Sequence, residues 1–196
     1  MVLHLPHGPN NDLCNLDQFQ MVIGRMKNAI DFGCKLNVGK YTLHLGYVKE
    51  LDREMLITHI TKILDEICDY AGKSLVMIEN MPGKSELGYS PKEIENIIFK
   101  TNKPNLKFIL DTGHAHLSEY DNIEYIDLLF PYLSHIHLSD NSGIRDEHGP
   151  LGTGTIPFDK IFSRLKDYQG LYCLEIIYQN IDDLLEYSKT LSGYFR

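Results

Sequence analysis

The chain has 196 residues, of which 43% are apolar and 23% are charged, an ordinary composition for a folded globular protein. This length fits one domain or an incomplete larger one, and it can bury a sizeable core without disulfides. The 19 basic and 27 acidic residues give a net charge of −8, which argues against a basic protein that coats nucleic acid. Carboxylates that cluster around bound cations remain compatible with this charge.

No apolar run approaches the ~20 residues that a membrane-spanning helix needs, so we expect no membrane partner. The first residues lack a basic segment followed by a long apolar stretch, so no signal peptide is predicted. None of the four cysteines belongs to a CxxC pair, which indicates ordinary reduced thiols rather than a disulfide framework. These features together predict a cytoplasmic protein.

Short apolar runs alternate with longer segments of helical periodicity along the whole chain. The strand-like runs are residues 2–5, 40–45, 74–79, 106–111, 134–138 and 171–176. The helical segments are, approximately, residues 17–36, 53–71, 90–100, 125–130, 154–168 and 180–191. Six βα units in series predict an α/β fold with one parallel sheet covered by helices, in a single domain that spans residues 1–196.

Two of the predicted helices begin with clear capping signals. Ser90 is followed by a first-turn proline, Pro91, and by Glu93 three residues after the cap, as in a capping box. Asn180, with Asp183 three residues on, is a similar start for the last helix. These signals support the order of elements, but they do not distinguish a doubly wound sheet from a barrel.

Every strand-like run has a histidine, an aspartate or a glutamate as its last or second-last residue. The six endings are His4, His44, Glu79, Asp111, His137 and Glu175. Because side chains alternate along a strand, these six would share one face of the sheet. A doubly wound sheet has helices on both faces and would bury all six at a high cost, whereas in a barrel they converge at the C-terminal mouth. The endings therefore favour a (β/α) barrel of the TIM type.

Three further metal-ligand types lie in the loops just beyond the strands, namely His114, Asp146 and His148. Nitrogen and carboxylate ligands without thiolates suit zinc, manganese or iron. His7 follows the first strand in a loop near the predicted mouth, where we expect it to contact substrate. His59 lies within the predicted helix 53–71 and is expected at the surface.

The loop before the fifth predicted helix contains Gly152 and Gly154, in the stretch Leu-Gly-Thr-Gly-Thr. Such a stretch can present backbone N–H groups and a helix N-terminus to a substrate anion. A tight turn before a helix explains the same two glycines, and the sequence leaves both interpretations open.

Seven segments resemble the xylose isomerase-like TIM barrel superfamily, AP endonuclease family 2, which includes endonuclease IV and sugar isomerases and epimerases. In family order they are residues 2–6, 43–46, 78–83, 110–115, 137–140, 146–154 and 174–176. The resemblance begins at the family's third strand. It therefore implies an N-terminally incomplete barrel with six of eight βα units, which lacks the first two.

The resemblance to endonuclease IV implies up to three zinc ions on nine ligands. The three implied sets are His4, His44 and Glu79; then Glu79, Asp111, His137 and Glu175; and last His114, Asp146 and His148. The sugar isomerases and epimerases usually keep one metal ion, on the second set. They use its two glutamates, here Glu79 and Glu175, to move protons next to a carbonyl.

Some positions depart from the endonuclease pattern. The endonuclease inserts an aromatic and an apolar side chain into DNA just after its first histidine ligand, where this chain has His7 and Gly8, a poor wedge. The Cys-His pair of the endonuclease is Gly113-His114 here, and the loop after His137 is shorter than in the endonuclease. That short loop resembles uncharacterised isomerase- or epimerase-like members.

Three hypotheses follow for the function. The first is hydrolysis of a phosphoester by a multinuclear zinc site, with abasic DNA as the family's best-known substrate. The second is isomerisation or epimerisation of a sugar or sugar phosphate with one zinc or manganese ion and a Glu79/Glu175 acid–base pair. The third is a metal-binding remnant without activity. Open parallel edges invite association, so a homodimer or some other cover over them is also expected.

Overall fold

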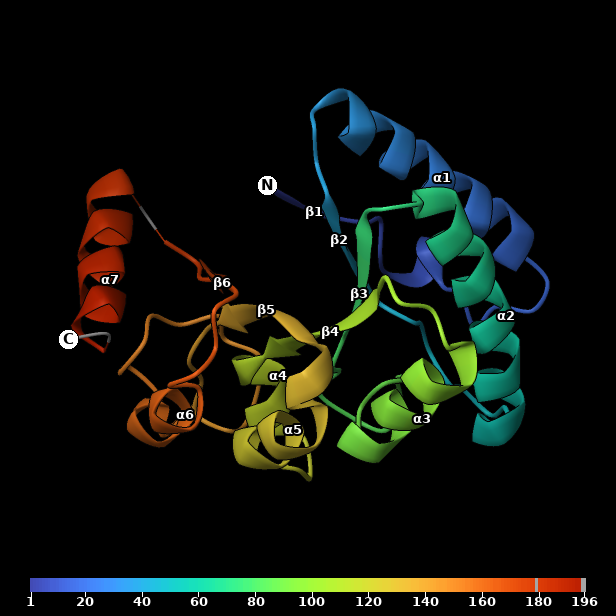
Figure 1. Ribbon diagram of the computed structural model, residues 1–196. Coiled ribbons are helices and arrows are strands. Elements are labelled where there is room, and N and C mark those ends of the chain that lie inside the picture. Colours follow the sequence, from blue (N-terminus) through green and yellow to red (C-terminus); the bar gives the residue numbers. More distant parts are fainter. Residues whose placement is uncertain (179, 195–196) are drawn as a thin grey trace.

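In the computed structural model, six parallel strands curl into a half-barrel with helices on its outer side (Figure 1). The structure describes residues 1–178 and 180–194. The strands follow the chain in the order β1-β2-β3-β4-β5-β6, and all neighbours are parallel. Their bounds are Val2–His4, Lys40–Leu43, Leu75–Glu79, Leu106–Asp111, Leu133–Leu138 and Leu171–Leu174. The predicted α/β barrel type with six βα units is thereby confirmed.

The main helices are α1 to α7, with short 3-10 turns η1 and η2. Their bounds are Phe19–Lys35, Arg53–Ala71, Pro91–Thr101, Thr112–Leu117, Asn122–Leu129, Phe158–Arg164 and Ile181–Gly193 for the α-helices, and Pro9–Asn11 and Phe130–Tyr132 for the turns. Helix α6 ends four residues earlier than the sequence predicted, and α5 starts three residues earlier. No helix in the described part of the chain is long and apolar enough to cross a membrane.

Helix α4 was not predicted, and the prediction that His114 lies in a loop is wrong. The helix begins directly after β4, where the Asp111 carboxylate caps it by accepting the His114 N–H at 2.7 Å. With six residues, α4 is too short to show a helical period in the sequence. It places His114 on the first turn, next to the end of its own strand.

Both predicted helix caps are present in the structure, but the one at the start of α3 lacks the second half of a capping box. Asn180 and Asp183 form a complete capping box at the start of α7. The Ser90 hydroxyl accepts the Glu93 N–H at 3.1 Å, but the Glu93 carboxylate does not return to the cap. It binds the Arg53 guanidinium, with Oε1 at 2.8 Å from Nε, and thereby ties α3 to the start of α2.

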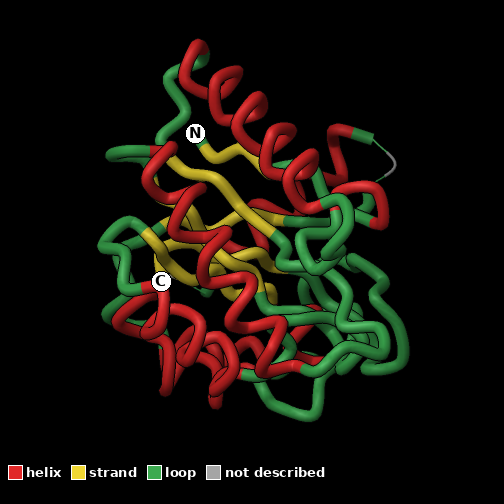
Figure 2. The backbone as a smooth tube through the Cα atoms, turned by 90° about the vertical axis from the view of Figure 1, so that its right-hand side faces the viewer, coloured by secondary structure: helices red, strands yellow, loops and turns green. Residues whose placement is uncertain are grey.

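The core lies between the outer face of the sheet and the helices. Leu43, Ile78, Leu110 and Leu138 are fully buried there, next to the polar strand endings in sequence, as the alternation predicted. Each such side chain contributes about 2 kcal/mol by its burial. The opposite, concave face carries the polar residues. Figure 2 shows the long loops, drawn in green, gathered at one side of the molecule.

Burial decreases toward the last strand. Leu171 on β6 is exposed, and none of the described residues of α7 is buried. Helix α7 stands at the side of the half-barrel (Figure 1), where Tyr194 packs on Phe162 with ring centroids 4.6 Å apart. The sheet of the described residues is thus open at β1 and β6.

Candidate metal centre

The predicted ligands gather at the carboxyl ends of the strands because parallel strands end at the same edge. His4, Glu79, Asp111 and His137 lie in the strands themselves, with Asp111 and His137 paired in register. His44 and Glu175 come directly after β2 and β6.

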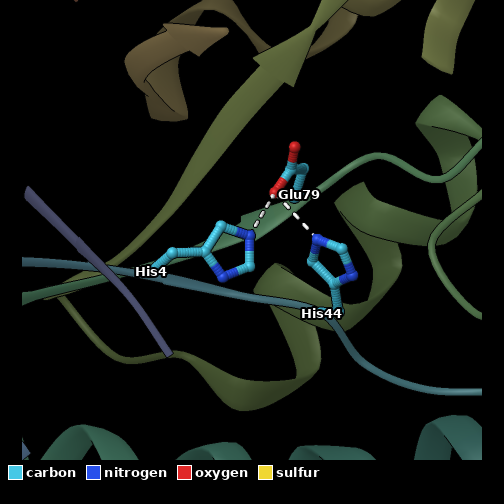
Figure 3. Close-up of side chains that lie close together, drawn as sticks. All are labelled: His4, His44 and Glu79. Atoms are coloured by element: carbon cyan, nitrogen blue, oxygen red, sulfur yellow. Dashed lines mark hydrogen bonds and ion pairs between the residues drawn. The ribbon is translucent and has the colours of Figure 1, made fainter. Parts of the chain in front are cut away.

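The first set surrounds one oxygen of Glu79 (Figure 3). His44 Nε2 lies 3.1 Å from Glu79 Oε2, and His4 Nε2 lies 3.4 Å from the same oxygen. The glutamate is only 1% exposed, and the two rings point toward it from β1 and from the end of β2. The three ligand atoms lie within 4.8 Å of one another, a spacing that can hold one metal ion.

The second set uses the other oxygen of the same glutamate. Glu79 Oε1 lies 3.0 Å from His137 Nδ1, and Glu175 Oε2 lies 2.5 Å from that nitrogen. Asp111 Oδ2 is 3.9 Å from it. One ligand atom from each of these four residues falls within a 4.8 Å cluster. Glu79 therefore faces both sets, as a bridging carboxylate would.

The third set is centred on Asp146. Its Oδ2 lies 2.9 Å from His148 Nε2 and 3.3 Å from His114 Nε2. His114 also joins this set to the second, because its Nδ1 is 3.9 Å from both Glu79 Oε1 and Asp111 Oδ1. All nine predicted residues thus lie in one continuous cluster, in which only the first two sets bring one ligand atom of every member within 4.8 Å of the others.

Backbone carbonyls fix the orientation of three histidine rings. The Nδ1 atoms of His4, His114 and His148 each lie 2.9 Å from a carbonyl oxygen, those of Leu5, Asn80 and Glu175 respectively. Because a carbonyl only accepts, each Nδ1 donates, and Nε2 is left to face the carboxylates. Histidines that bind metals are oriented in the same way.

The charges in the cluster are strongly coupled. Burial acts to raise the pKa of Glu79, but hydrogen bonds with His137, His4 and His44 lower it well below its usual range. Burial likewise acts to lower the pKa of His137, but hydrogen bonds with Glu175 and Glu79 raise it to about 11. The metal-free chain therefore balances its buried carboxylates with protonated imidazole.

Asp111 tests whether a cation fits this cluster. The side chain is fully buried, and burial raises its pKa to about 6. Its Oδ2 finds no hydrogen-bond donor among the described residues. A buried carboxylate oxygen without a partner is costly, and a metal ion in the second set would supply one. The donor set of imidazole and carboxylate also fits zinc or manganese.

A family model described as xylose isomerase-like TIM barrel matches residues 2–193. The chain belongs to this family. Named relatives in the family are enzymes, both endonuclease-like proteins and sugar epimerases, so membership leaves the reaction class open.

Two curated relatives and one solved structure illustrate the similarity. An uncharacterized protein of Methanocaldococcus jannaschii is 30% identical over 91% of this chain and 72% of its own length. A probable endonuclease 4 of Mycoplasma mobile is 29% identical over 82% of this chain and 62% of its own. The crystal structure of a D-tagatose 3-epimerase-like protein is 27% identical, with a TM-score of 0.88, over 99% of this chain and 76% of that one.

The chain thus spans between 62% and 72% of these curated relatives. That the remainder corresponds to the first two βα units of the family barrel stays a prediction.

Asn80 is a buried part of the site that the sequence analysis missed. Its Oδ1 accepts the Asp111 N–H at 2.7 Å, and its Nδ2 donates to the Asp111 carbonyl at 3.0 Å. Its own carbonyl accepts from His114, as described above. Asn80 therefore holds one ligand of the second set and one of the third. Its place directly after the Glu79 strand ending was the available signal.

Two other histidines are near or outside the cluster. The His7 ring is exposed, and its centroid lies 4.7 Å from those of His4 and His44, so it stands at the mouth of the first set. Its contact with substrate stays a prediction. His59, expected at the surface, is instead half-buried, with Nε2 donating to the Leu13 carbonyl at 3.3 Å.

Gly152 and Gly154 need a correction. Both N–H groups donate to Asp140 Oδ2, each at 2.9 Å. The anion that these donors hold is therefore a carboxylate of the chain itself. These two N–H groups are therefore already used by Asp140, and the predicted role of Gly152 and Gly154 in binding a substrate anion does not fit the structure.

Proposed function

We propose that this chain hydrolyses a phosphoester with several divalent metal ions, up to three and preferably zinc, on the nine clustered ligands. The observation that carries the proposal is the third set of His114, Asp146 and His148. Both histidine rings of that set are oriented by backbone carbonyls so that Nε2 faces Asp146. An isomerase with one metal ion would use the second set alone, so three further ligand-type residues beside it favour a multinuclear site.

When bound, the metal ions would stabilise charge on phosphate oxygens and lower the pKa of a water nucleophile. The residues of the chain divide the remaining work. Glu79 orients the first two sets against each other through its two oxygens. Glu175, whose side chain is 37% exposed, is the carboxylate with access to substrate, and we assign it the transfer of the proton from water.

His7 is the residue that we assign to hold the substrate. Burial and the neighbouring rings of His44 and His4 lower its pKa, which favours the neutral imidazole. A neutral ring at the mouth of the first set can donate a hydrogen bond to a phosphate oxygen without repelling the metal ions.

The loops at the mouth favour a compact substrate over a long duplex. In the sequence they contain three cationic residues, Lys49, Lys84 and Arg145. Each is paired: with Asp12 at 3.1 Å, Glu119 at 2.6 Å and Glu147 at 3.2 Å respectively. Affinity for duplex DNA depends on cations that neutralise several phosphates. We therefore propose a small phosphoester and keep abasic DNA, which the endonuclease 4-like relative suggests, as an arm of the test.

The test combines metal content with turnover. The purified chain is reconstituted with zinc, and metal per chain is measured by elemental analysis. Cleavage of bis(p-nitrophenyl) phosphate, sugar phosphates and an abasic duplex is then measured with and without chelator. More than one zinc per chain with chelator-sensitive cleavage supports the proposal. One metal ion per chain and no cleavage of any phosphoester overturns it.

A sugar epimerase with one zinc or manganese ion is the second candidate. Glu79 and Glu175 approach the same nitrogen of His137, at 3.0 and 2.5 Å, so two carboxylates line one binding position. The similarity to a D-tagatose 3-epimerase-like structure supports this candidate. Incorporation of deuterium from solvent into ketohexoses or their phosphates, followed by NMR, distinguishes it from hydrolysis. An inactive remnant would show neither reaction.

The open side of the half-barrel is a candidate surface for association with a second copy of the chain. Ile177, Ile181 and Leu185 are exposed near β6, together with Leu171 on the strand. Unpaired strands and exposed apolar side chains favour association, so we propose a homodimer that covers this side. Light scattering over a range of protein concentrations tests this, and a monomer throughout would exclude it. The cytoplasmic location also stays a prediction.

A further inference from the structure

The loop between β5 and α6 carries two ligands of the third set, Asp146 and His148, and it is folded around one buried carboxylate. That carboxylate belongs to Asp140, which is 1% exposed and lies just after β5. It takes part in none of the three ligand sets, and the proposed hydrolysis does not use it.

Asp140 accepts four backbone hydrogen bonds from its own loop. Oδ1 accepts the N–H groups of Asn141 at 2.9 Å and Ile156 at 3.1 Å. Oδ2 accepts those of Gly152 and Gly154, both at 2.9 Å. Four donors on one carboxylate join both ends of the loop. Charge-assisted bonds of this kind are stronger than bonds between neutral groups.

The two glycines are required by this close wrapping. A Cβ at Gly154 would lie 2.3 Å from the Asn141 carbonyl oxygen and 2.5 Å from Asp140 Oδ1, so no other residue fits there. Gly152 has φ +87°, in the left-handed region that glycine adopts readily. The two glycines thus allow the backbone to approach the Asp140 carboxylate closely enough to donate hydrogen bonds to it.

The folded loop connects Asp140 directly to His148. The backbone of Asp140 pairs with Gly149, next to His148, through N–H···O bonds of 2.8 Å in both directions. The His148 carbonyl accepts the Ile177 N–H at 2.8 Å, and its Nδ1 donates to the Glu175 carbonyl. His148 is therefore held on one side by the Asp140 pairing and on the other by the segment after β6.

We propose that Asp140 is a positioning residue that holds Asp146 and His148 against His114, so that the third set can take a metal ion. The inference rests on the proposed function only in that the third set binds a metal. Asparagine cannot replace the carboxylate, because its NH2 group would face N–H donors where Oδ1 or Oδ2 now accepts. Asp140→Asn removes acceptors and adds a donor, with almost no change in size.

The test compares Asp140→Asn with two matched variants. Asp146→Asn removes a ligand and leaves the Asp140 bonds intact, whereas Asp127→Asn changes an aspartate on α5 that pairs with Arg164 away from the cluster. Zinc per chain is measured by elemental analysis. Amide hydrogen exchange of Gly149, Gly152, Gly154 and Ile177 is measured in metal-free protein, where it reports the placement of the loop without activity.

We expect Asp140→Asn to lose one zinc per chain, to keep the zinc of the first two sets, and to exchange these four amides at least tenfold faster. Asp146→Asn should lose the same zinc with unchanged exchange, and Asp127→Asn should change neither. Should Asp140→Asn fail to fold, Asp140→Glu replaces it in the test, because it keeps the carboxylate but displaces it. We expect this variant to show a smaller loss of zinc and a smaller increase in amide exchange.

Other outcomes decide against the inference. If Asp140→Asn had the zinc content and the amide exchange of the wild type, the inference would be overturned. An equal loss of zinc from all three sets together with a lower Tm would also overturn it, because that result indicates a purely structural role for Asp140. A wild type that never binds a third zinc contradicts the proposed function instead. In that case the exchange of Ile177 alone decides whether Asp140 positions His148, with an unchanged rate overturning the inference.

Discussion

Glu79 Oε1 lies 3.0 Å from His137 Nδ1, although β4 separates β3 from β5 in the sheet. Neighbouring strands are about 4.8 Å apart, so β3 and β5 would be about 10 Å apart in a flat sheet. The strands curl into a half-barrel (Figure 1), which turns the polar face inward. The long side chain of Glu79 spans the remaining distance to His137. The cluster is therefore a product of barrel curvature.

Replacing Glu79 with glutamine should remove metal ions from the first two sets together. The amide keeps the size of the side chain but loses the charge that His4, His44 and His137 face. We expect zinc content to fall by two per chain. The metal-free protein should lose up to about 3–5 kcal/mol of unfolding free energy, because protonated His137 would lose one of its two carboxylate partners and keep only Glu175. Elemental analysis and denaturant unfolding measure both effects.

Glu119→Gln is the control for this variant. Glu119 is an exposed glutamate that pairs with Lys84 at 2.6 Å, and ion pairs in solvent contribute little to stability. We expect unchanged zinc content and a small change in stability. If Glu79→Gln kept its zinc, the shared-carboxylate arrangement would be refuted.

Metal binding should release protons near neutral pH. Without metal, the pKa of His137 is about 11, because its hydrogen bonds with Glu175 and Glu79 outweigh burial, which acts to lower it. The raised pKa stabilises the metal-free fold fully below about pH 6.5, and this contribution is lost as the pH rises through about 11. A metal ion on Nδ1 must displace the proton, so zinc affinity should increase with pH across that window.

Calorimetric titrations with zinc in two buffers of different ionisation enthalpy measure this proton release. The apparent binding enthalpy should differ between the buffers in proportion to the protons released. Equal enthalpies in both buffers would mean that zinc binding releases no proton. His137 would then keep its proton and would not be a ligand.

The sequence was sufficient for the strand endings because two strong rules act together. Alternation along a strand assigns each residue to a face, and parallel strands end at one edge. These rules located Glu79 and Asp111 correctly even though the bounds of β2 and β6 are shorter than predicted. A shift of strand bounds by one or two residues does not change which face a side chain occupies.

The parts that the sequence could not predict depend on single contacts between distant residues. Asn80 acts on Asp111, 31 residues away, through a side-chain amide that has no periodic signal. Asp140 competes with any external anion for the N–H groups of Gly152 and Gly154. That the Asp140 carboxylate occupies them is visible only in the three-dimensional structure. Glycine spacing alone therefore could not decide between a substrate-binding loop and a turn closed on an internal carboxylate.

Asn80→Ala tests the role of this buried amide. It would leave the Asp111 N–H and carbonyl without their side-chain partners, at a cost of about 1–3 kcal/mol for each buried group. We expect weaker zinc binding in the second set with the first set retained. Asn10→Ala, at an exposed position of η1, is the control and should change stability by no more than about 0.5 kcal/mol. Full zinc affinity in Asn80→Ala would show that Asp111 needs no such support.

Gly113, where the endonuclease pattern has cysteine, should tolerate no side chain. A Cβ there would lie 2.5 Å from Ser139 Oγ and 3.3 Å from Asp111 Oδ1. Gly113→Ala must therefore displace the buried Ser139 hydroxyl or the start of α4, and we expect a loss of about 1–3 kcal/mol and weaker binding of the third zinc through His114. Gly24→Ala is the matched control, because its Cβ would meet nothing within 4 Å in the middle of α1. The better helix propensity of alanine should stabilise that variant by about 1 kcal/mol. Thermal unfolding and zinc content measure both variants, and a Gly113→Ala protein as stable as Gly24→Ala would disprove the close approach of α4 to Ser139.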